Sequence, residues 1–151
     1  KRSWYGDMFT TNYLTTMNAW REIRKAINND EDPRFSMAQI LKVAAMHRVT
    51  DTYGPIPYLN FGVSKEVPYD SQKDVYYRFF EELDGAINNL DSYAASGSKV
   101  LSSWDCVFNG DVTSWIKFAN SLRLRLALHL AYVDETRQKV KPNWLLAIVM
   151  D

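Results

Sequence analysis

The sequence is poor in the residues that form disulfide bonds and metal sites. It contains one cysteine, Cys106, and two histidines, His47 and His129. A single thiol cannot form an internal disulfide bond, and one cysteine with two distant histidines offers too few ligands for a zinc site of recognisable spacing. The sequence therefore predicts no metal and no cofactor. We expect Cys106 to be a small buried hydrophobic residue and each histidine to have a structural or solvent-exposed role.

Signatures of catalysis are also missing from the sequence. No GxSxG, HExxH, P-loop or GxGxxG pattern occurs. Three acidic residues, Glu81, Glu82 and Asp84, fall within one turn of an expected helix, where such a group usually forms a solvated face. The sequence thus predicts a protein that is not an enzyme.

The chain has no surplus of charge and no long apolar run. Its 18 basic side chains balance 18 acidic ones, which gives no electrostatic reason to expect nucleic acid or an anionic membrane as a partner. No run approaches the ~18–20 apolar residues of a membrane span, and the first residues, KRSWYGDMFTTNY, lack the apolar region of a signal peptide. The most apolar run, residues 144–150 (WLLAIVM), stops without a cap or turn residue. We therefore expect the chain to be part of a longer protein.

What the sequence does contain is the composition of one globular domain, residues 1–151. Apolar residues make up 46% of the chain, and aromatic residues make up 14%, with five tryptophans and nine tyrosines. Such an aromatic share is high. It indicates either a core rich in rings or ring faces displayed for ligands.

Hydrophobic periodicity predicts four helices and the beginning of a fifth. The expected helices cover residues 13–27, 33–53, 72–93, 111–133 and 142 onward. Ser71 is the expected cap of the third helix, with Asp74 as its capping-box partner, and Gly54 offers a left-handed cap at the end of the second. No convincing strand pair is visible, and residues 100–108 are equally compatible with a loop. The predicted fold class is all-α, with stacked antiparallel helical hairpins of loosely tetratricopeptide-like spacing.

The helix expected at residues 111–133 is apolar over most of its circumference. Its polar residues form one narrow stripe at four-residue steps: Lys117, Ser121, Arg125 and His129. A helix of this kind is typically buried among other helices. Asn120 and Arg123 lie on the side expected to be buried, so each needs hydrogen-bond partners.

Residues 51–61, DTYGPIPYLNF, crowd two prolines and a glycine between aromatic residues. Each proline fixes φ, removes a backbone donor and drives the preceding residue towards extended geometry. The stretch should therefore end the second helix sharply and lead an extended segment away from it. This indicates a structural corner rather than an active site, with Asp51 paired with Arg48 or capping locally.

Aromatic residues gather at or beyond the ends of the expected helices. In that position a ring can stack on the apolar face of a sugar, or it can hold a loop against a helix. We take five residues as candidates for ligand binding: Trp4, Tyr5, Tyr58, Asn60 and Trp104.

Three stretches in this order and spacing resemble the SusD/RagB family: DTYGPIPY, PYDSQKDVYYRFFEELDGAINNL and NGDVTSWIKFANSLRLRLALHL. The resemblance is closest to its SusD-like group and spans about residues 35–133. It carries the family's Tyr-Gly-x-Ile-Pro-Tyr corner at residues 53–58 and its Gly-Asp…Trp…Phe-Ala-Asn-Ser-Leu-Arg-x-Arg helix at residues 110–126. The motif residues that we interpret as fold-defining are Tyr53, Gly54, Pro55, Pro57, Asp111, Trp115, Asn120 and Arg123.

The resemblance implies an outer-membrane lipoprotein of the cell surface that is mostly helical and has tetratricopeptide-like units. Such proteins cap a TonB-dependent SusC-type transporter and capture glycans, or in some branches peptides, without catalysis. The implied partners are therefore a glycan or oligosaccharide and that transporter, with no nucleic acid. Contact with the membrane would depend on a lipid anchor that this chain does not include. A helical scaffold for docking and a peptide-capturing protein stay open as alternatives.

Overall fold

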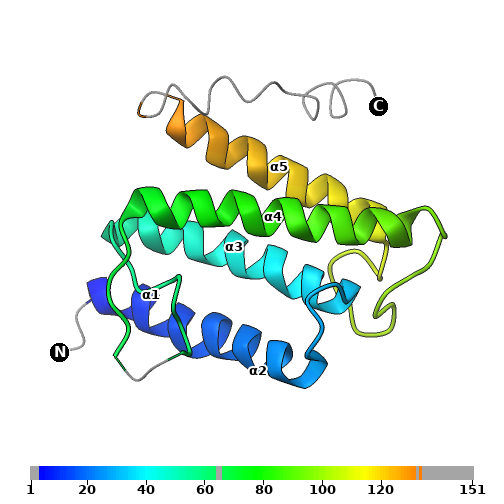
Figure 1. Cartoon of the computed structure of the whole chain (residues 1–151), viewed down its shortest axis with the longest axis horizontal. Helices are drawn as coiled ribbons and strands as arrows, with labels where there is room; N and C mark the ends of the chain where they lie inside the picture. The colour runs from blue at the N-terminus through cyan, green and yellow to red at the C-terminus, as the bar shows by residue number, and fades with distance from the viewer. Residues whose placement is uncertain (1–3, 64–65, 132, 134–151) are drawn as a thin grey trace.

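The computed structural model describes residues 4–63, 66–131 and 133, and within them the chain forms helices joined by turns and loops (Figure 1). The elements are α1 (Trp4–Asn12), a π-helical segment η1 (Tyr13–Met17), α2 (Asn18–Ile27), α3 (Pro33–Tyr53), α4 (Gln72–Ala94) and α5 (Val112–Leu130). The described ranges contain no strand, only the isolated bridges between Ile56 and Asp70 and between Lys99 and Asp111. The all-α prediction is confirmed. The helix expected from Pro142 onward lies outside the described residues.

The first helical region is a continuous rod made of α1, η1 and α2. The periodicity that starts at Tyr13 predicts only its second half. The rod ends where expected, at Asn28, whose φ of 47° and ψ of 34° place it in the left-handed region. Asparagine tolerates this conformation better than most residues, and its N–H bonds to the Arg24 carbonyl at 2.9 Å.

Local capping sets the bounds of the longer helices. Asp32 accepts a bond from Arg34 N at 2.8 Å at the start of α3, Ser71 accepts one from Asp74 N at 3.1 Å at the start of α4, and Asp111 accepts one from Ser114 N at 2.9 Å at the start of α5. The last turn of α3 ends at Gly54. Its φ of 74° is positive as expected, but its ψ of −124° lies outside the left-handed helical region, so the expected left-handed cap is wrong.

The helices pack as antiparallel neighbours around one core. α3 lies between α2 and α4, and α4 lies between α3 and α5 (Figure 1). Fully buried side chains from every layer meet in this core, among them Met17, Ile40, Phe79, Leu83 and Trp115. None of the helices in the described part of the chain is both long enough and apolar enough to span a membrane.

α5 is buried on one face only within the described residues, so the expectation of burial around most of its circumference is wrong there. The buried face consists of Val112, Trp115, Ala119, Leu122 and Leu126, whereas Leu128 is 61% exposed.

Asn120 and Arg123 have some of the expected partners, although the buried Arg123 Nε has no hydrogen bond among the described residues. Arg123 Nη2 lies 2.9 Å from Asp84 Oδ1, and Nη1 donates to Asn120 Oδ1 at 3.4 Å. The carboxylate of α4 thus compensates the partly buried guanidinium of α5.

Candidate functional site

The proline-rich corner after α3, residues 53–58, is a structural element that places the Tyr58 side chain in the core. Ile56 and Asp70 exchange two backbone bonds, of 3.2 and 3.0 Å. The Asp70 carboxylate then accepts bonds of 2.8 Å from the backbone N–H groups of Tyr58 and Leu59. Because the segment is held at both positions, the Tyr58 ring enters the core, where it is 4% exposed and contacts Phe79 edge to face.

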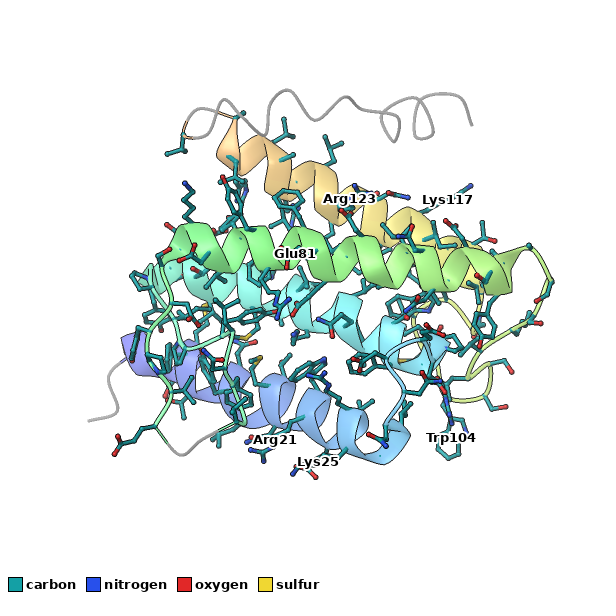
Figure 2. All side chains as sticks on the ribbon, in the orientation of Figure 1. Arg21, Lys25, Glu81, Trp104, Lys117 and Arg123 are labelled. Carbon is teal, nitrogen blue, oxygen red and sulfur yellow. The ribbon has the colours of Figure 1, made fainter. Side chains whose placement is uncertain are left out.

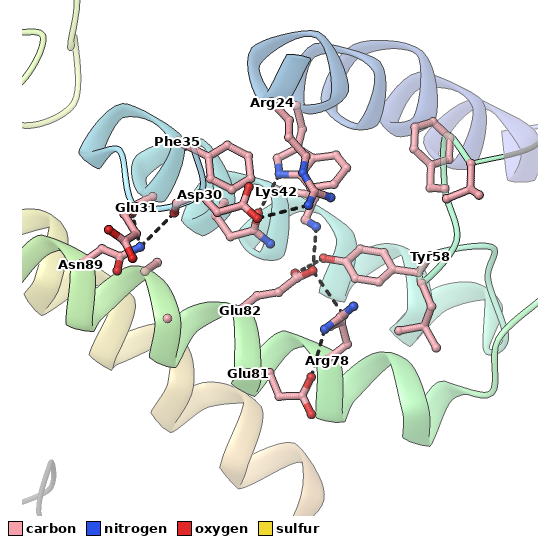
Figure 3. A pocket seen from close by; sticks show the side chains of 18 residues that line it. Arg24, Asp30, Glu31, Phe35, Lys42, Tyr58, Arg78, Glu81, Glu82 and Asn89 are labelled. Atoms are coloured by element: carbon pink, nitrogen blue, oxygen red, sulfur yellow. Dashed lines mark hydrogen bonds and ion pairs between the residues drawn. The ribbon is translucent and has the colours of Figure 1, made fainter. Parts of the chain in front are cut away.

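A buried lysine joins three helices and this corner. Lys42 of α3 is 2% exposed, and its Nζ lies 2.9 Å from Glu82 Oε1 of α4. The ammonium group also lies 3.8 Å from the ring of Trp20 in α2 and 4.6 Å from the ring of Tyr58. Tyr58 donates its hydroxyl to the other oxygen of Glu82 at 2.6 Å (Figure 3). Burial lowers the pKa of Lys42 to about 8, although Glu82 opposes this shift.

The acidic residues of α4 therefore do not form one solvated face. The expectation holds for Glu81, whose side chain is 63% exposed, and is wrong for Glu82, whose side chain is 14% exposed. The sequence pattern failed here because Glu82 meets its partner, Lys42, only through the packing of α4 on α3.

A cavity of about 360 Å³ opens beside this cluster, between α2, α3 and α4 (Figure 3). We call it the α2–α4 cavity. Its inner wall includes Lys42, Tyr58 and Gln39, and Gln39 accepts a 2.7 Å bond from Trp20 Nε1. Its volume lies within the range of about 300–1,000 Å³ that is typical of small-molecule sites.

The rim of the α2–α4 cavity is polar and already ion-paired. Arg24 lies 3.2 Å from Asp30, and Arg78 lies 3.2 Å from Glu81. Both pairs line the opening (Figure 3). The periodicity of the sequence placed Trp20 on the apolar stripe of its helix, but neither periodicity nor motifs singled out Gln39, Lys42 or Gly85. The one available signal was the presence of Gln39 and Lys42 at helical spacing within an otherwise apolar segment.

The loop between α4 and α5 presents Trp104 to solvent. Its ring is 85% exposed and projects away from the helices (Figure 2). Asp105 holds the loop, because its carboxylate accepts bonds of 2.9 Å from Val107 N, 2.8 Å from Gly110 N and 2.8 Å from Trp115 Nε1. The exposed tryptophan therefore stands next to a residue that is fixed to α5.

The loop between α4 and α5 contains residues with positive φ and exposes its cysteine. Leu101 has a φ of 56°, which is uncommon for leucine, and Gly110 is required because a Cβ there would lie 2.5 Å from the Val100 carbonyl oxygen. Cys106 is exposed, so the expectation of a buried cysteine is wrong.

The candidate ligand-binding residues do not gather in one place. Tyr58 forms part of the wall of the α2–α4 cavity, Asn60 is exposed in the turn that follows, and Trp104 lies on the separate loop. Trp4 and Tyr5 form the first turn of α1, and their side chains lie outside what the structure describes.

A second polar cluster lies where α3, α4 and α5 meet. Tyr76 donates its hydroxyl to Asp51, and His129 Nδ1 lies 3.0 Å from that hydroxyl and 3.3 Å from Asp51 Oδ2. The expected pairing of Asp51 with Arg48 is therefore wrong, because the packing of α4 brings Tyr76 to it instead. A hollow of about 820 Å³ adjoins the cluster.

The remaining histidine, His47, is buried beside this cluster. Its Nδ1 lies 3.2 Å from the Val43 carbonyl oxygen, and burial lowers its pKa.

In the ranges that the structure describes, no group of histidine, cysteine and acidic residues is arranged to hold a metal ion.

Known proteins resemble the chain both in sequence and in structure. A family model described as SusD-like, Susd and RagB outer membrane lipoprotein, matches residues 1–144. A SusD homolog from Bacteroides uniformis is 41% identical, with a TM-score of 0.67, and the match covers 88% of this chain and 25% of that one. A chitin-binding SusD homolog from Flavobacterium johnsoniae is 37% identical, with a TM-score of 0.83 and coverages of 89% and 28%. A SusD-like protein from Bacteroides thetaiotaomicron is 30% identical, with a TM-score of 0.83 and the same coverages.

The chain spans about a quarter of the length of these solved relatives. No curated protein shows significant similarity to it. The resemblance that the motifs predict for about residues 35–133 therefore extends over a longer stretch, residues 1–144.

Proposed function

Because the chain belongs to the SusD/RagB family of outer membrane lipoproteins, we propose that the whole protein is a non-catalytic cell-surface component that captures oligosaccharides. The captured glycan would be imported by a TonB-dependent SusC-type transporter. Members of the family are generally binding proteins without catalysis. The chitin-binding relative from Flavobacterium johnsoniae supports a glycan as the ligand.

The observation that carries this proposal is the exposed ring of Trp104. Trp104 is 85% exposed, and the bonds to Asp105 fix the loop beside it. An aromatic ring on a restrained loop offers a sugar ring an apolar surface at a smaller cost in backbone conformational entropy on binding. Leu101 and Val107 of the same loop are also exposed, at 42% and 53%.

The proposal is tested with the full-length protein on a glycan array that includes soluble chitooligosaccharides. We expect binding to at least one glycan, and an affinity that is lower in Trp104→Ala by up to about tenfold, since loss of one stacked ring removes about 0.5–1.5 kcal/mol. Tyr69→Ala is the matched control, because Tyr69 is also an exposed ring, at 66%, but lies on a different loop. If no glycan binds, oligosaccharide capture is contradicted, and a peptide library becomes the next screen.

A separate measurement addresses the transporter. Under the proposal, the Trp104→Ala protein still co-purifies with its SusC-type partner, because the ring serves the ligand rather than the docking surface. Loss of co-purification in this variant, with glycan binding retained, would instead support the alternative of a docking scaffold.

A further inference from the structure

A buried amide with an unused donor lines the α2–α4 cavity. Gln39 is 7% exposed, and its Oε1 accepts the bond from Trp20 Nε1. That bond sets the orientation of the amide, so its Nε2 group is left as the donor on the other side. Within residues 4–63, 66–131 and 133, Nε2 has no hydrogen-bond partner. This Nε2 atom is not one of the fully buried polar atoms without a partner, so it reaches the solvent of the cavity and can donate to water or to a ligand.

Unused acceptors lie along the same cavity. Asn89 Nδ2 donates to the Asp30 carbonyl at 3.0 Å and to Ser36 Oγ at 3.4 Å, which leaves Asn89 Oδ1 without a partner among the described residues. The carboxylate of Glu31 has no ion pair or hydrogen bond there either. The cavity therefore offers one amide donor together with an amide oxygen and a carboxylate as acceptors. Hydroxyl groups, which both donate and accept, match this combination.

The charges of the α2–α4 cavity disfavour an anionic ligand. Three cations line it, Arg24, Lys42 and Arg78, and each is already paired with a carboxylate. The lining carboxylates are Asp30, Glu31, Glu81 and Glu82, one more than the cations. An incoming carboxylate or sulfate would have no free cation to meet and would face the unpaired Glu31.

A glycine in the middle of α4 leaves one wall of the cavity open. Gly85 is exposed and lines the cavity, and a Cβ added to it would meet nothing within 4 Å. Neither packing nor a positive φ requires glycine here, although glycine inside a helix costs about 1 kcal/mol relative to alanine. Glycine has a known use where a ligand approaches the backbone closely.

From these four observations we propose that the α2–α4 cavity is a binding site for an uncharged sugar residue, whose hydroxyl groups bond to Gln39, Asn89 and Glu31 and whose ring lies against Gly85. This inference rests on the proposed function and names both the class of glycan and a site apart from Trp104. Uronic acids and sulfated sugars are excluded from the site.

The test uses the full-length protein with galactotriose, maltotriose and cellotriose as neutral probes and trigalacturonate as the acidic one. Gly85→Leu fills the open wall, and Asn88→Leu is the matched control, because Asn88 is exposed on the same helix and does not line the cavity. We expect an affinity for the bound neutral trisaccharide at least about tenfold lower in Gly85→Leu and unchanged in Asn88→Leu. Trigalacturonate should bind at least about tenfold more weakly than galactotriose.

A second readout does not depend on that variant. With 5-fluorotryptophan incorporated, the ¹⁹F resonance of Trp20, assigned through Trp20→Phe, should shift when the neutral trisaccharide is added. Equal affinity in Gly85→Leu and wild type, an unmoved Trp20 resonance, or tight binding of trigalacturonate would overturn the inference while leaving glycan capture intact. Absence of binding to every glycan would overturn both.

Discussion

Tyr58 donates a hydrogen bond of 2.6 Å to Glu82, and the other oxygen of the same carboxylate lies 2.9 Å from Lys42 Nζ. One carboxylate of α4 therefore holds both the corner that follows α3 and the buried lysine within α3. Because Lys42 and Glu82 are 40 residues apart, this contact exists only when the helices are packed.

Replacement of Glu82 should destabilise the protein far more than replacement of its neighbour. Glu82→Ala leaves Lys42 buried without its anion and Tyr58 without its acceptor, and we expect a loss of about 3 kcal/mol in the free energy of unfolding. Glu81→Ala, at an exposed position, should cost about 0.5 kcal/mol or less. Urea denaturation at pH 7 measures both variants. Equal losses would show that the buried ion pair contributes nothing beyond a surface one.

Lys42 should make the protein more stable as the pH rises through the weakly alkaline range. Burial lowers its pKa to about 8 in the folded state, so the folded protein releases this proton before the unfolded chain does. The unfolded state then binds more protons between about pH 8 and pH 10, and the free energy of unfolding rises. Lys42→Met should remove this rise. Urea titrations at half-unit pH steps show whether the slope depends on Lys42.

Above about pH 10 the stability should fall. Burial raises the pKa of Tyr13, Tyr58 and Tyr76, and the charge of Glu82 adds to the shift at Tyr58. These phenols stay protonated in the folded protein while those of the unfolded chain ionise near pH 10, so unfolding becomes more favourable as the pH rises. Tyrosinate absorbance should increase together with the loss of helical circular dichroism. Ionisation of all tyrosines in the fully helical protein would contradict this prediction.

Acidification should destabilise the protein through His47. Its pKa is lowered by burial, so below about pH 6.5 the unfolded chain takes up a proton that the folded protein does not. The stability that the neutral imidazole contributes is present above that pH and is lost as the pH falls. His47→Leu should show a smaller loss between pH 7.5 and pH 5.5 than wild type. The midpoint of thermal unfolding at the two pH values measures the difference.

Asp105 should control both the loop and the ring that it presents. Asp105→Ala removes the acceptor of three backbone N–H groups and of Trp115 Nε1, and we expect a loss of about 2 kcal/mol or more in stability. Asp91→Ala, at an exposed position of α4, is the control and should change stability by about 0.5 kcal/mol or less. Glycan affinity should fall in Asp105→Ala to a similar extent as in Trp104→Ala. Unchanged affinity would show that the position of Trp104 does not matter for binding.

The starts of α3, α4 and α5 and the corner could be predicted from the sequence, since each depends on residues that are close together in the chain, whereas the start of α1 was missed. Asp32, Ser71 and Asp111 cap the helices that follow them through bonds two or three residues away. The prolines after Gly54 end α3 in the same local way. The resemblance to the SusD/RagB family could also be recognised from the sequence, because the family motifs are contiguous stretches of residues.

The candidate site was decided by the tertiary structure. Whether a carboxylate faces water or a buried lysine depends on which face of α4 meets α3, and the sequence around Glu82 is compatible with both. The same holds for Asp51, which bonds to Tyr76 25 residues away rather than to its neighbour Arg48. Gln39 and Gly85 line one cavity only because α2, α3 and α4 pack around it. Local bonding thus determined where α3, α4 and α5 begin, whereas the packing of distant faces determined which side chains line the cavity.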